Sequence, residues 1–188
     1  GALFFIYLAG YALQSTWSYF TIEVFSWSEK MIGYSLGFVG IMVALVQGGL
    51  IRIINPKLGQ KRAVYFGLIL NSIGFVLFSF ANEGWMMFAI LVPYCLGGIG
   101  GPALQGIISN QVPANAQGEL QGSLTGIMSI TSIIGPVLMT GLFSYFTSPN
   151  NTIHFPGAPF MMGALLCLVS LIFAMRSLAS YVESKSAK

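Results

Sequence analysis

The sequence predicts an all-α integral membrane protein, a bundle of six transmembrane helices. Its composition is the first reason: 55% of the 188 residues are hydrophobic and 7% are charged, whereas soluble domains carry about 25% charged residues. The second reason is that six apolar runs, each near the ~20 residues that cross a bilayer, alternate with short polar links. A charge at the bilayer centre costs about 2.5–3.5 kcal/mol. Nearly all charges accordingly lie in the links.

The first three spans are predicted at residues 3–22, 31–54 and 63–81. The first opens on an apolar run without a basic leader, which suggests that the chain is a segment of a longer polypeptide. A polar link around Glu29 separates it from the second span, and a strongly basic link at residues 55–62 separates the second span from the third.

The last three spans are predicted at residues 85–109, 120–146 and 158–178. A tight turn precedes the fourth span. A short polar link that contains Pro113 and Glu119 separates the fourth from the fifth. An uncharged loop with the only histidine, His154, leads to the sixth, and a polar tail follows it.

The distribution of lysine and arginine predicts the orientation, because cytoplasmic loops are enriched in these residues. One of them, Lys30, falls on one side of the predicted membrane. The others fall on the opposite side: Arg52, Lys57, Lys61, Arg62, Arg176, Lys185 and Lys188. Both ends of the chain are therefore predicted to be cytoplasmic. Topology explains the net charge of +3, so no nucleic-acid partner is predicted.

Glycines concentrate where the fourth span ends and the fifth begins, in residues 97–126. Glycine lets helix backbones approach closely in lipid, and proline removes a backbone donor and clashes with the preceding turn. Gly100, Gly101 and Pro102 are therefore predicted to form a bend used in gating.

Four amide side chains lie well inside four different spans: Gln14, Gln47, Asn71 and Gln105. Polar residues inside a membrane are rare and usually functional. Each amide alone could instead serve an interhelical hydrogen bond, worth about 0.6–2 kcal/mol. Their spread over four spans favours a shared polar cavity, which we expect near the bilayer midplane.

The basic link after the second span has two interpretations. Arg52, Lys57, Lys61 and Arg62 can anchor the topology by binding anionic lipid headgroups. They can also form a gating loop, which pairs with helix ends or acids of a partner and releases them during transport.

Residues 33–37 read Gly-Tyr-Ser-Leu-Gly and match the nucleophile pattern that requires a strand before it and a helix after it. Here the pattern opens an apolar helix, His154 lies in a loop, and aspartate is absent from the sequence. A serine nucleophile needs a base, so the pattern is interpreted as a small-residue packing face and the chain is predicted not to be an enzyme. Cys95 and Cys167 are interpreted as packing residues, and no metal site is predicted.

Four motifs carry a family resemblance: WSEKMIGYSL at residues 27–36, GGIGGPALQ at 97–105, QGELQGSL at 117–124 and TSIIGP at 131–136. Together they resemble the carboxy-terminal half of the tetracycline efflux pumps, in the drug:proton antiporter branch of the major facilitator superfamily. The resemblance implies that the six spans are helices seven to twelve of a twelve-helix transporter. It also implies proton-driven export of tetracycline-like amphipathic drugs across a bacterial inner membrane, by alternating access between two halves.

The resemblance also implies roles for individual residues. The family's helix-seven tryptophan matches Trp17 and its helix-eight glutamine matches Gln47, and both are associated with the drug pathway. Tyr34 and Phe38 would add apolar and stacking surface for a planar drug. The implied partners are the drug, protons, membrane lipid and the amino-terminal six-helix half. No cofactor is implied, and a metal would arrive only as a chelate of the drug.

The sequence departs from the family at two positions. The family commonly has an acid in helix nine where this chain has Asn71, and often a basic residue where it has Asn110. An amide cannot carry a proton, so either coupling relies on the other half or the substrate differs. The first alternative is an exporter of another small neutral solute, such as a sugar or metabolite, which the lack of charge deep in the spans fits. An alternative of a different class is a six-helix channel or structural membrane protein acting alone.

Overall fold

The computed structural model describes residues 1–179, with the backbone alone at residues 55 and 56. These residues form helices and no strand, which confirms the predicted all-α fold. The helices are α1 (Ala2–Phe25), α2 (Glu29–Leu45), a π-helical turn (Val46–Leu50), α3 (Ile51–Leu58), α4 (Gln60–Ser79), α5 (Gly84–Gly97), α6 (Gly100–Asn110), a 3₁₀ turn (Ala114–Ala116), α7 (Gln117–Thr147) and α8 (Ala158–Ser177). Lys185 and Lys188, which entered the orientation argument, lie outside the described residues.

Five helical segments of the described chain are long and apolar enough to cross a membrane: Glu29–Ile54, Gln60–Ser79, Gly84–Asn110, Ala114–Thr147 and Ala158–Ser177. The remaining predicted span corresponds to α1, which has 24 residues and is not among the five. Its second half carries the polar run at residues 14–16, which lowers its hydropathy. A count of six spans therefore remains a prediction at α1.

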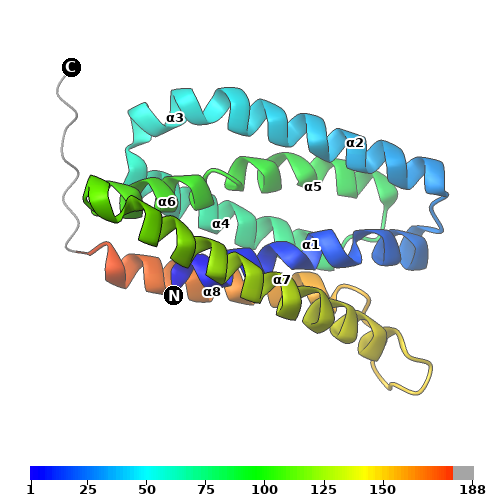
Figure 1. Cartoon of the computed structure of the whole chain (residues 1–188). Coiled ribbons are helices and arrows are strands. Elements are labelled where there is room, and N and C mark those ends of the chain that lie inside the picture. Colours follow the sequence, from blue (N-terminus) through cyan, green and yellow to red (C-terminus); the bar gives the residue numbers. More distant parts are fainter. Residues whose placement is uncertain (180–188) are drawn as a thin grey trace.

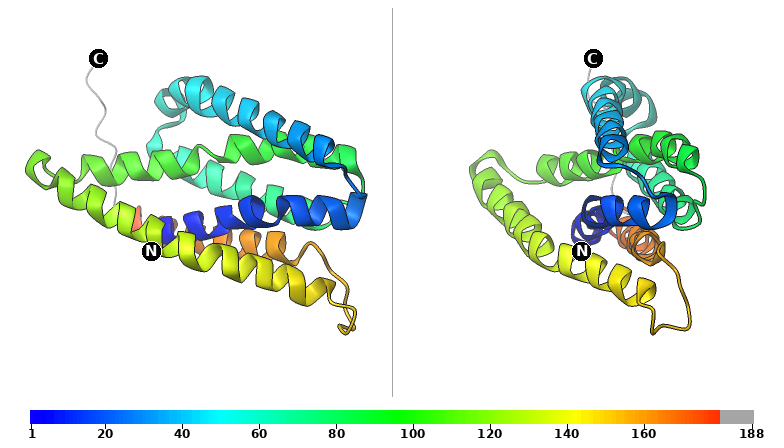
Figure 2. Two further views of the ribbon diagram at one scale, coloured as in Figure 1. Left: turned by 45° about the vertical axis from the view of Figure 1, so that its right-hand side comes forward. Right: turned by 90° about the vertical axis from the view of Figure 1, so that its right-hand side faces the viewer.

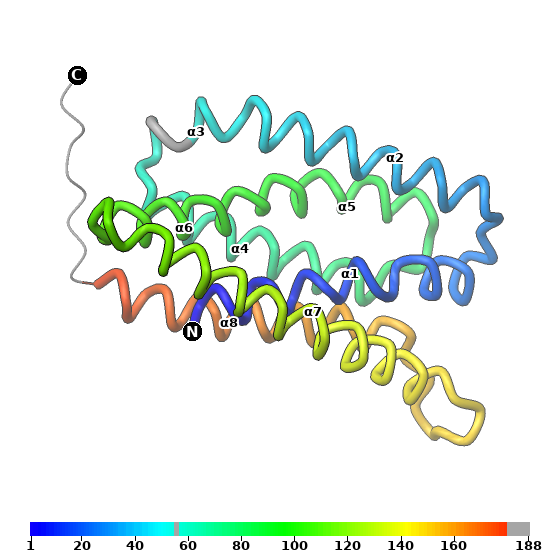
Figure 3. The backbone as a smooth tube through the Cα atoms, in the orientation of Figure 1, coloured from blue at the N-terminus to red at the C-terminus, as the bar shows by residue number. Residues whose placement is uncertain are grey.

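α2, the π-helical turn and α3 form one continuous helical rod. At 1.5 Å per residue the rod is about 45 Å long, more than the roughly 30 Å of hydrocarbon, so it extends beyond the hydrocarbon unless it is strongly tilted. The link predicted at residues 55–62 is corrected, because the helix continues to Leu58 and α4 begins at Gln60. Between them Gly59 has a φ of 82°, a conformation that favours glycine. Figure 3 follows the chain from α2 through α3 into α4.

The fourth predicted span consists of two helices, because α5 ends at Gly97 and α6 begins at Gly100. The bend expected in this region is present, but it lies at Gly98 and Ile99 rather than at Pro102. Pro102 occupies the first turn of α6, where a missing backbone donor costs little. The break therefore comes from the glycines, and its use in gating remains a prediction.

α1, α4 and α8 make up the centre of the bundle. α8 packs against both α4 and α1, α5 and α6 cover α4, and α7 packs mainly on α1. α2 contacts the rest of the bundle mainly through α5. Figures 1 and 2 show α2 and α7 at opposite edges, with the other helices between them. The two outermost helices thus have faces that the described chain leaves uncovered.

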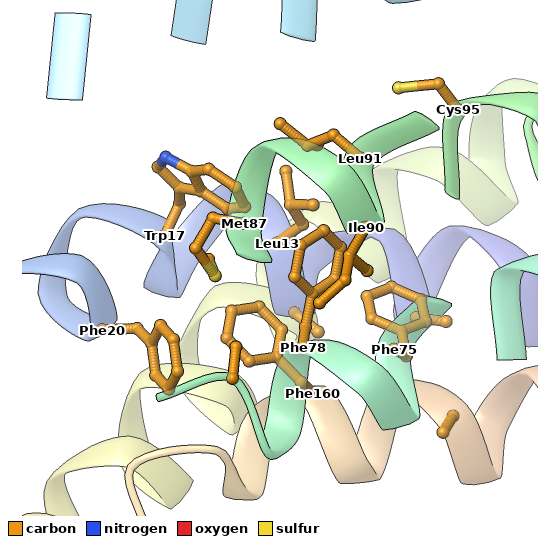
Figure 4. Packing of buried hydrophobic residues seen from close by; sticks show 14 of the residues in the cluster. Leu13, Trp17, Phe20, Phe75, Phe78, Met87, Ile90, Leu91, Cys95 and Phe160 are labelled. Atoms are coloured by element: carbon orange, nitrogen blue, oxygen red, sulfur yellow. The ribbon is translucent and has the colours of Figure 1, made fainter. Parts of the chain in front are cut away.

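An aromatic cluster forms the core between α1, α4, α5 and α8 (Figure 4). The ring of Trp17 meets Phe78 edge to face at 5.6 Å between centroids, and Phe20 meets Phe160 in the same way at 4.9 Å. Such pairs contribute about 0.5–1.5 kcal/mol beyond the burial of their area. These pairs fix α1 against α4 and α8, and so determine which side of α1 faces away from the core.

Candidate functional site

One face of α1 carries Tyr7, Tyr11 and Gln14. Residues spaced by three or four positions lie on one face of a helix. The side of α1 that meets the core carries Leu13, Trp17 and Phe20, all buried, whereas Tyr7 and Tyr11 are half-buried and Gln14 is exposed. The core contacts therefore turn a polar and aromatic stripe of α1 away from α4 and α8.

This stripe lines a cavity of about 240 Å³ between α1 and α7. The lining residues are Ile6, Tyr7, Gly10, Tyr11, Gln14, Met128 and Thr131. Pockets that enclose a whole small ligand measure about 300–1,000 Å³. The cavity therefore has room for part of a ligand, with the remainder of the ligand outside the described residues.

A hydrogen bond joins this cavity to the broken helix. The Gln105 Nε2 group on α6 donates to the Tyr7 hydroxyl oxygen at 2.6 Å. Within the part of the chain that the structure describes, the amide of Gln14 has no hydrogen-bond partner. The Thr131 hydroxyl is already used by its own helix, since it donates to the carbonyls of Ile127 and Met128 at 3.0 and 2.9 Å. The polar groups left for a ligand are thus on α1.

The close approach of α7 to α1 depends on Gly135. A Cβ added there would collide with the ring of Tyr11, only 2.5 Å from its Cγ atom. Atoms essentially never approach this closely, so any larger residue at this position would force the Tyr11 side chain or α7 to shift. Gly135 lets the Tyr11 ring lie close against α7, where it forms part of the cavity wall.

The sequence-predicted residues fall into three places. Gln14 lines the cavity and Gln105 binds its Tyr7. On α2, Tyr34 is 72% exposed. Also on α2, the ring of Phe38 packs edge to face on Phe88 at 5.5 Å between centroids. Gln47 is exposed in the π-helical turn, and Asn71 lies on α4. The structure thus brings together two of the four amides, and the roles of the others remain predictions.

Asn71 lies against the helix break rather than in the cavity. Its Oδ1 atom is buried without a hydrogen-bond partner among the described residues, and it would meet a Cβ added at Gly97. One turn earlier on α4, a Cβ at Gly67 would lie 2.5 Å from the backbone nitrogen of Gly100. α4 and the break therefore pack backbone against backbone, and the Asn71 amide occupies the space at Gly97.

Trp17 is 1% exposed and gives a ligand no surface in this conformation. Its indole N–H donates to the Ser35 Oγ atom at 2.9 Å, and the Ser35 hydroxyl donates to the Ile32 carbonyl at 2.7 Å. The serine of the Gly-x-Ser-x-Gly pattern is therefore a contact between α1 and α2. The association of Trp17 with a drug pathway remains a prediction. In this structure the indole packs in the core and holds α1 to α2.

The basic residues predicted to act in gating lie at one end of the bundle, on α3 and at the start of α4. Arg52, Lys57 and Arg62 are exposed on α3 and at the start of α4. The Lys61 ammonium donates to the Ala179 carbonyl at 3.5 Å, which connects α4 with the chain after α8. Gly101 and Pro102 stand in the first turn of α6, beside the break. The choice between a lipid anchor and a gate remains open.

A second cavity of about 390 Å³ lies between the start of α1, the end of α6, α7 and the end of α8. Its walls are mainly leucine, isoleucine and phenylalanine side chains, with Gln111, Ser123 and Ser177 as the polar ones. Directional recognition needs several convergent polar groups. Three of the 15 lining residues are polar here, against four of the seven that line the smaller cavity beside Tyr7, so the smaller cavity is the better candidate for a specific site.

Comparison with known families identifies the fold. The family model described as Major Facilitator Superfamily matches residues 1–187. The chain belongs to this superfamily. The resemblance found in its motifs is thereby confirmed at the level of the superfamily, and the cavity between α1 and α7 can be considered as part of a facilitator transporter.

Curated relatives include several bacterial resistance proteins. The chain is 39% identical to the tetracycline resistance protein, class C, of Escherichia coli over 89% of the chain and 41% of that relative. It is 36% identical to the class G protein of Vibrio anguillarum over 96% of the chain and 46% of that relative. It is 26% identical to human hippocampus abundant transcript-like protein 1 over 92% of the chain. The chain thus spans less than half the length of these resistance proteins, and no solved structure matches it significantly.

Reasoning from the sequence missed Tyr7, Tyr11 and Thr131. Tyrosines in apolar helices are common at membrane interfaces, so the search for intramembrane amides passed over them. A signal was present, because Tyr7, Tyr11 and Gln14 recur at helical spacing on one face of α1. The helix face on which an amide lies is thus as informative about the location of the site as the amide itself.

Proposed function

We propose that this chain is the carboxy-terminal half of a transporter that exports tetracycline-like amphipathic drugs by alternating access, in exchange for protons. The observation that carries the proposal is the cavity between α1 and α7, which offers two tyrosines and an amide without a partner in the described chain. Flat compounds with ring oxygens suit such a surface, because they need stacking area and a few hydrogen bonds. The resistance proteins named above support the same substrate class.

The uncovered faces of α2 and α7 support an amino-terminal half as the partner. Ile133 and Val137 on α7 are 70% and 73% exposed. Glycines with open space where a Cβ would be recur on the same two helices: Gly33, Gly37, Gly40, Gly118, Gly122 and Gly126. In lipid, small residues mark surfaces on which helices pack closely. The positions of Gly33, Gly37 and Gly40 on α2 meet no atom of the described chain, which is consistent with a partner helix outside it.

The positions of the charges support a bacterial inner-membrane orientation with both ends of this segment in the cytoplasm. α3, the start of α1 and the end of α8 lie at one end of the bundle (Figure 1). That end carries Arg52, Lys57, Arg62 and Arg176, whereas Lys30 starts α2 at the other end. Cytoplasmic sides are enriched in lysine and arginine, and anionic lipid is the partner that this basic end would meet.

Proton coupling is assigned to the other half. Within residues 1–179 the acidic side chains stand at helix ends, with Glu23 near the end of α1 and Glu29, Glu83 and Glu119 at the starts of α2, α5 and α7. Asn71 cannot carry a proton. Acids that face the cavity from the other half would therefore couple export to the proton gradient, and neither a cofactor nor a resident metal takes part.

The test uses the full-length transporter in inside-out membrane vesicles with an imposed proton gradient. Uptake of labelled tetracycline should collapse when an uncoupler is added and should weaken in Gln14→Ala and Gln47→Ala. The matched control is Asn150→Ala, an exposed amide in the loop before α8, which should transport normally. No uptake of tetracycline with the gradient intact would refute the proposal.

A neutral solute is the second candidate substrate, because the cavity lining has no charged side chain. A facilitator that exports a sugar or metabolite would bind it with the same tyrosines and amides. Asn71→Asp restores the acid common in the tetracycline pumps. If it changes neither drug export nor proton coupling, Asn71 has no part in distinguishing the two candidates.

A further inference from the structure

The Tyr7 hydroxyl is placed as a hydrogen-bond donor with no acceptor in the described chain. Its oxygen accepts the hydrogen bond from Gln105 Nε2 at 2.6 Å, and no described group accepts the phenolic proton in return. A tyrosine hydroxyl can donate and accept at once. Because Tyr7 lines the cavity between α1 and α7, its proton is available to whatever enters the cavity.

The partner on α6 strengthens this donor and fixes its position. A hydroxyl that accepts a hydrogen bond becomes a better donor, because chains of hydrogen bonds polarise one another. Gln105 lies in the second turn of α6, which begins at the helix break where Gly100 packs on Gly67. The close packing of α6 on α4 thus directs the Gln105 amide toward α1 and holds the Tyr7 oxygen beside it.

The rest of the cavity wall favours a flat ligand. Gly135 leaves room for the Tyr11 ring to lie against α7, and Met128 adds a flexible apolar surface that suits aromatic rings. The Gln14 amide has no partner among the described residues and can donate or accept. Thr131 contributes less, since its hydroxyl proton is used by its own helix.

We infer that Tyr7 is a ligand-binding residue whose hydroxyl donates a hydrogen bond to a ketone or phenolate oxygen on a flat ring of the exported compound. Gln105 is its positioning residue, which orients the hydroxyl without needing to touch the ligand, and Tyr11 and Gln14 complete the subsite. The inference rests on the proposed export of amphipathic drugs, and it names the oxygen that this half of the transporter recognises.

Uptake kinetics of the full-length transporter give the first test. Tyr7→Phe keeps the ring and removes the donor. Because one hydrogen bond is worth a factor of roughly 2–13 in affinity, we expect KM for tetracycline to rise about 3–10-fold while the maximal rate changes less than about twofold. Gln105→Leu should raise KM in the native background and add nothing in the Tyr7→Phe background. The matched control is Tyr145→Phe, an exposed tyrosine at the far end of α7, which should leave KM unchanged.

A pair of soluble probes gives a second test that does not depend on tetracycline transport. Anthraquinone-2-carboxylate and anthracene-2-carboxylate are flat three-ring acids of similar size. They differ at carbons 9 and 10, which bear ketone oxygens in the quinone and hydrogens in the anthracene. Calorimetric titration compares their binding to the purified transporter. The native protein should prefer the quinone, and Tyr7→Phe should remove the preference.

The two tests separate the possible failures. If the native vesicles take up tetracycline but Tyr7→Phe keeps the native KM, the inference is overturned and the proposed function stands. If the vesicles take up no tetracycline, the proposed function fails, and the probe pair still decides the subsite. A native protein without a preference for the quinone, or a Tyr7→Phe variant with the same preference, overturns the inference in either case.

Discussion

Replacing Ser35 by alanine tests whether Trp17 holds α1 to α2 or contacts the drug. The change removes the acceptor of the Trp17 indole N–H, which now donates to Ser35 Oγ at 2.9 Å. The indole is 1% exposed and Ser35 is 0% exposed, so no water can take the place of the hydroxyl without repacking. A buried donor left without its partner costs about 1–3 kcal/mol.

We expect Ser35→Ala to lower the free energy of unfolding by about 2 kcal/mol, the middle of that range. Because the relatives are more than twice as long as this chain, such a loss lowers the midpoint of thermal unfolding of the full-length transporter by roughly 2–4 °C. The measurement is thermal unfolding of the full-length transporter in detergent, alongside KM for tetracycline uptake in vesicles. Ser144→Ala, an exposed serine near the end of α7, serves as the control and should leave the midpoint unchanged.

The double variant Trp17→Phe with Ser35→Ala separates the packing role from a role in binding. If the bond matters for stability, the two substitutions together should cost less than the sum of their separate effects. An unchanged unfolding midpoint in Ser35→Ala, together with a raised KM in Trp17→Phe at native stability, would refute the packing argument. Trp17 would then reach the drug in a conformation other than the present one.

Three further predictions concern the helix break and the link that follows it. Gly67→Ala should destabilise the protein by about 1–3 kcal/mol, because its Cβ would lie 2.5 Å from the backbone nitrogen of Gly100. Thermal unfolding measures this loss, and an unchanged midpoint would contradict the close packing. Gln117→Ala should speed proteolysis of the link between α6 and α7, because the Gln117 amide donates to the carbonyls of Ser109 and Val112 at 2.8 Å each. Gel electrophoresis measures the cleavage rate, and a native rate would count against this role of Gln117. Asn71→Leu should leave the free energy of unfolding unchanged or raise it by about 1 kcal/mol, because it removes a buried acceptor without a partner in the described chain. A clear loss of stability in thermal unfolding would mean that the amide has a partner there.

Most of the fold could be predicted from the sequence, because the spacing of apolar runs follows from the thickness of a bilayer. The glycines of residues 97–101 also predicted a bend correctly. The helical continuation to Leu58 could not be predicted, since the basic and polar residues around it are as typical of a link as of a short helix outside the hydrocarbon. The exact site of the bend was missed because Pro102 is compatible with the first turn of a helix as well as with a kink.

The candidate site was predicted only in part. Gln14 and Gln105 stand out because an amide inside a membrane is costly unless it has a use. Tyr7 could not be ranked from sequence alone, because its importance comes from Gln105, which is far away in the chain and reaches it across a helix contact. Tyr11 depends in the same way on Gly135, whose missing side chain is meaningful only once α7 is packed on α1.

The helix α1 carries the candidate site and is not among the five candidate membrane spans, and the two facts have a common explanation. Length does not account for its exclusion, because α1 has 24 residues and two of the five qualifying segments have 20. The polar side chains that lower its hydropathy are mostly satisfied, since the Thr16 hydroxyl donates to the Ala12 carbonyl and the Trp17 indole donates to Ser35. Gln14 has no such partner in the described chain. Departures from a local rule concentrate at functional sites, so this glutamine is the group whose hydrogen bonds must come from a ligand, water or the other half of the transporter.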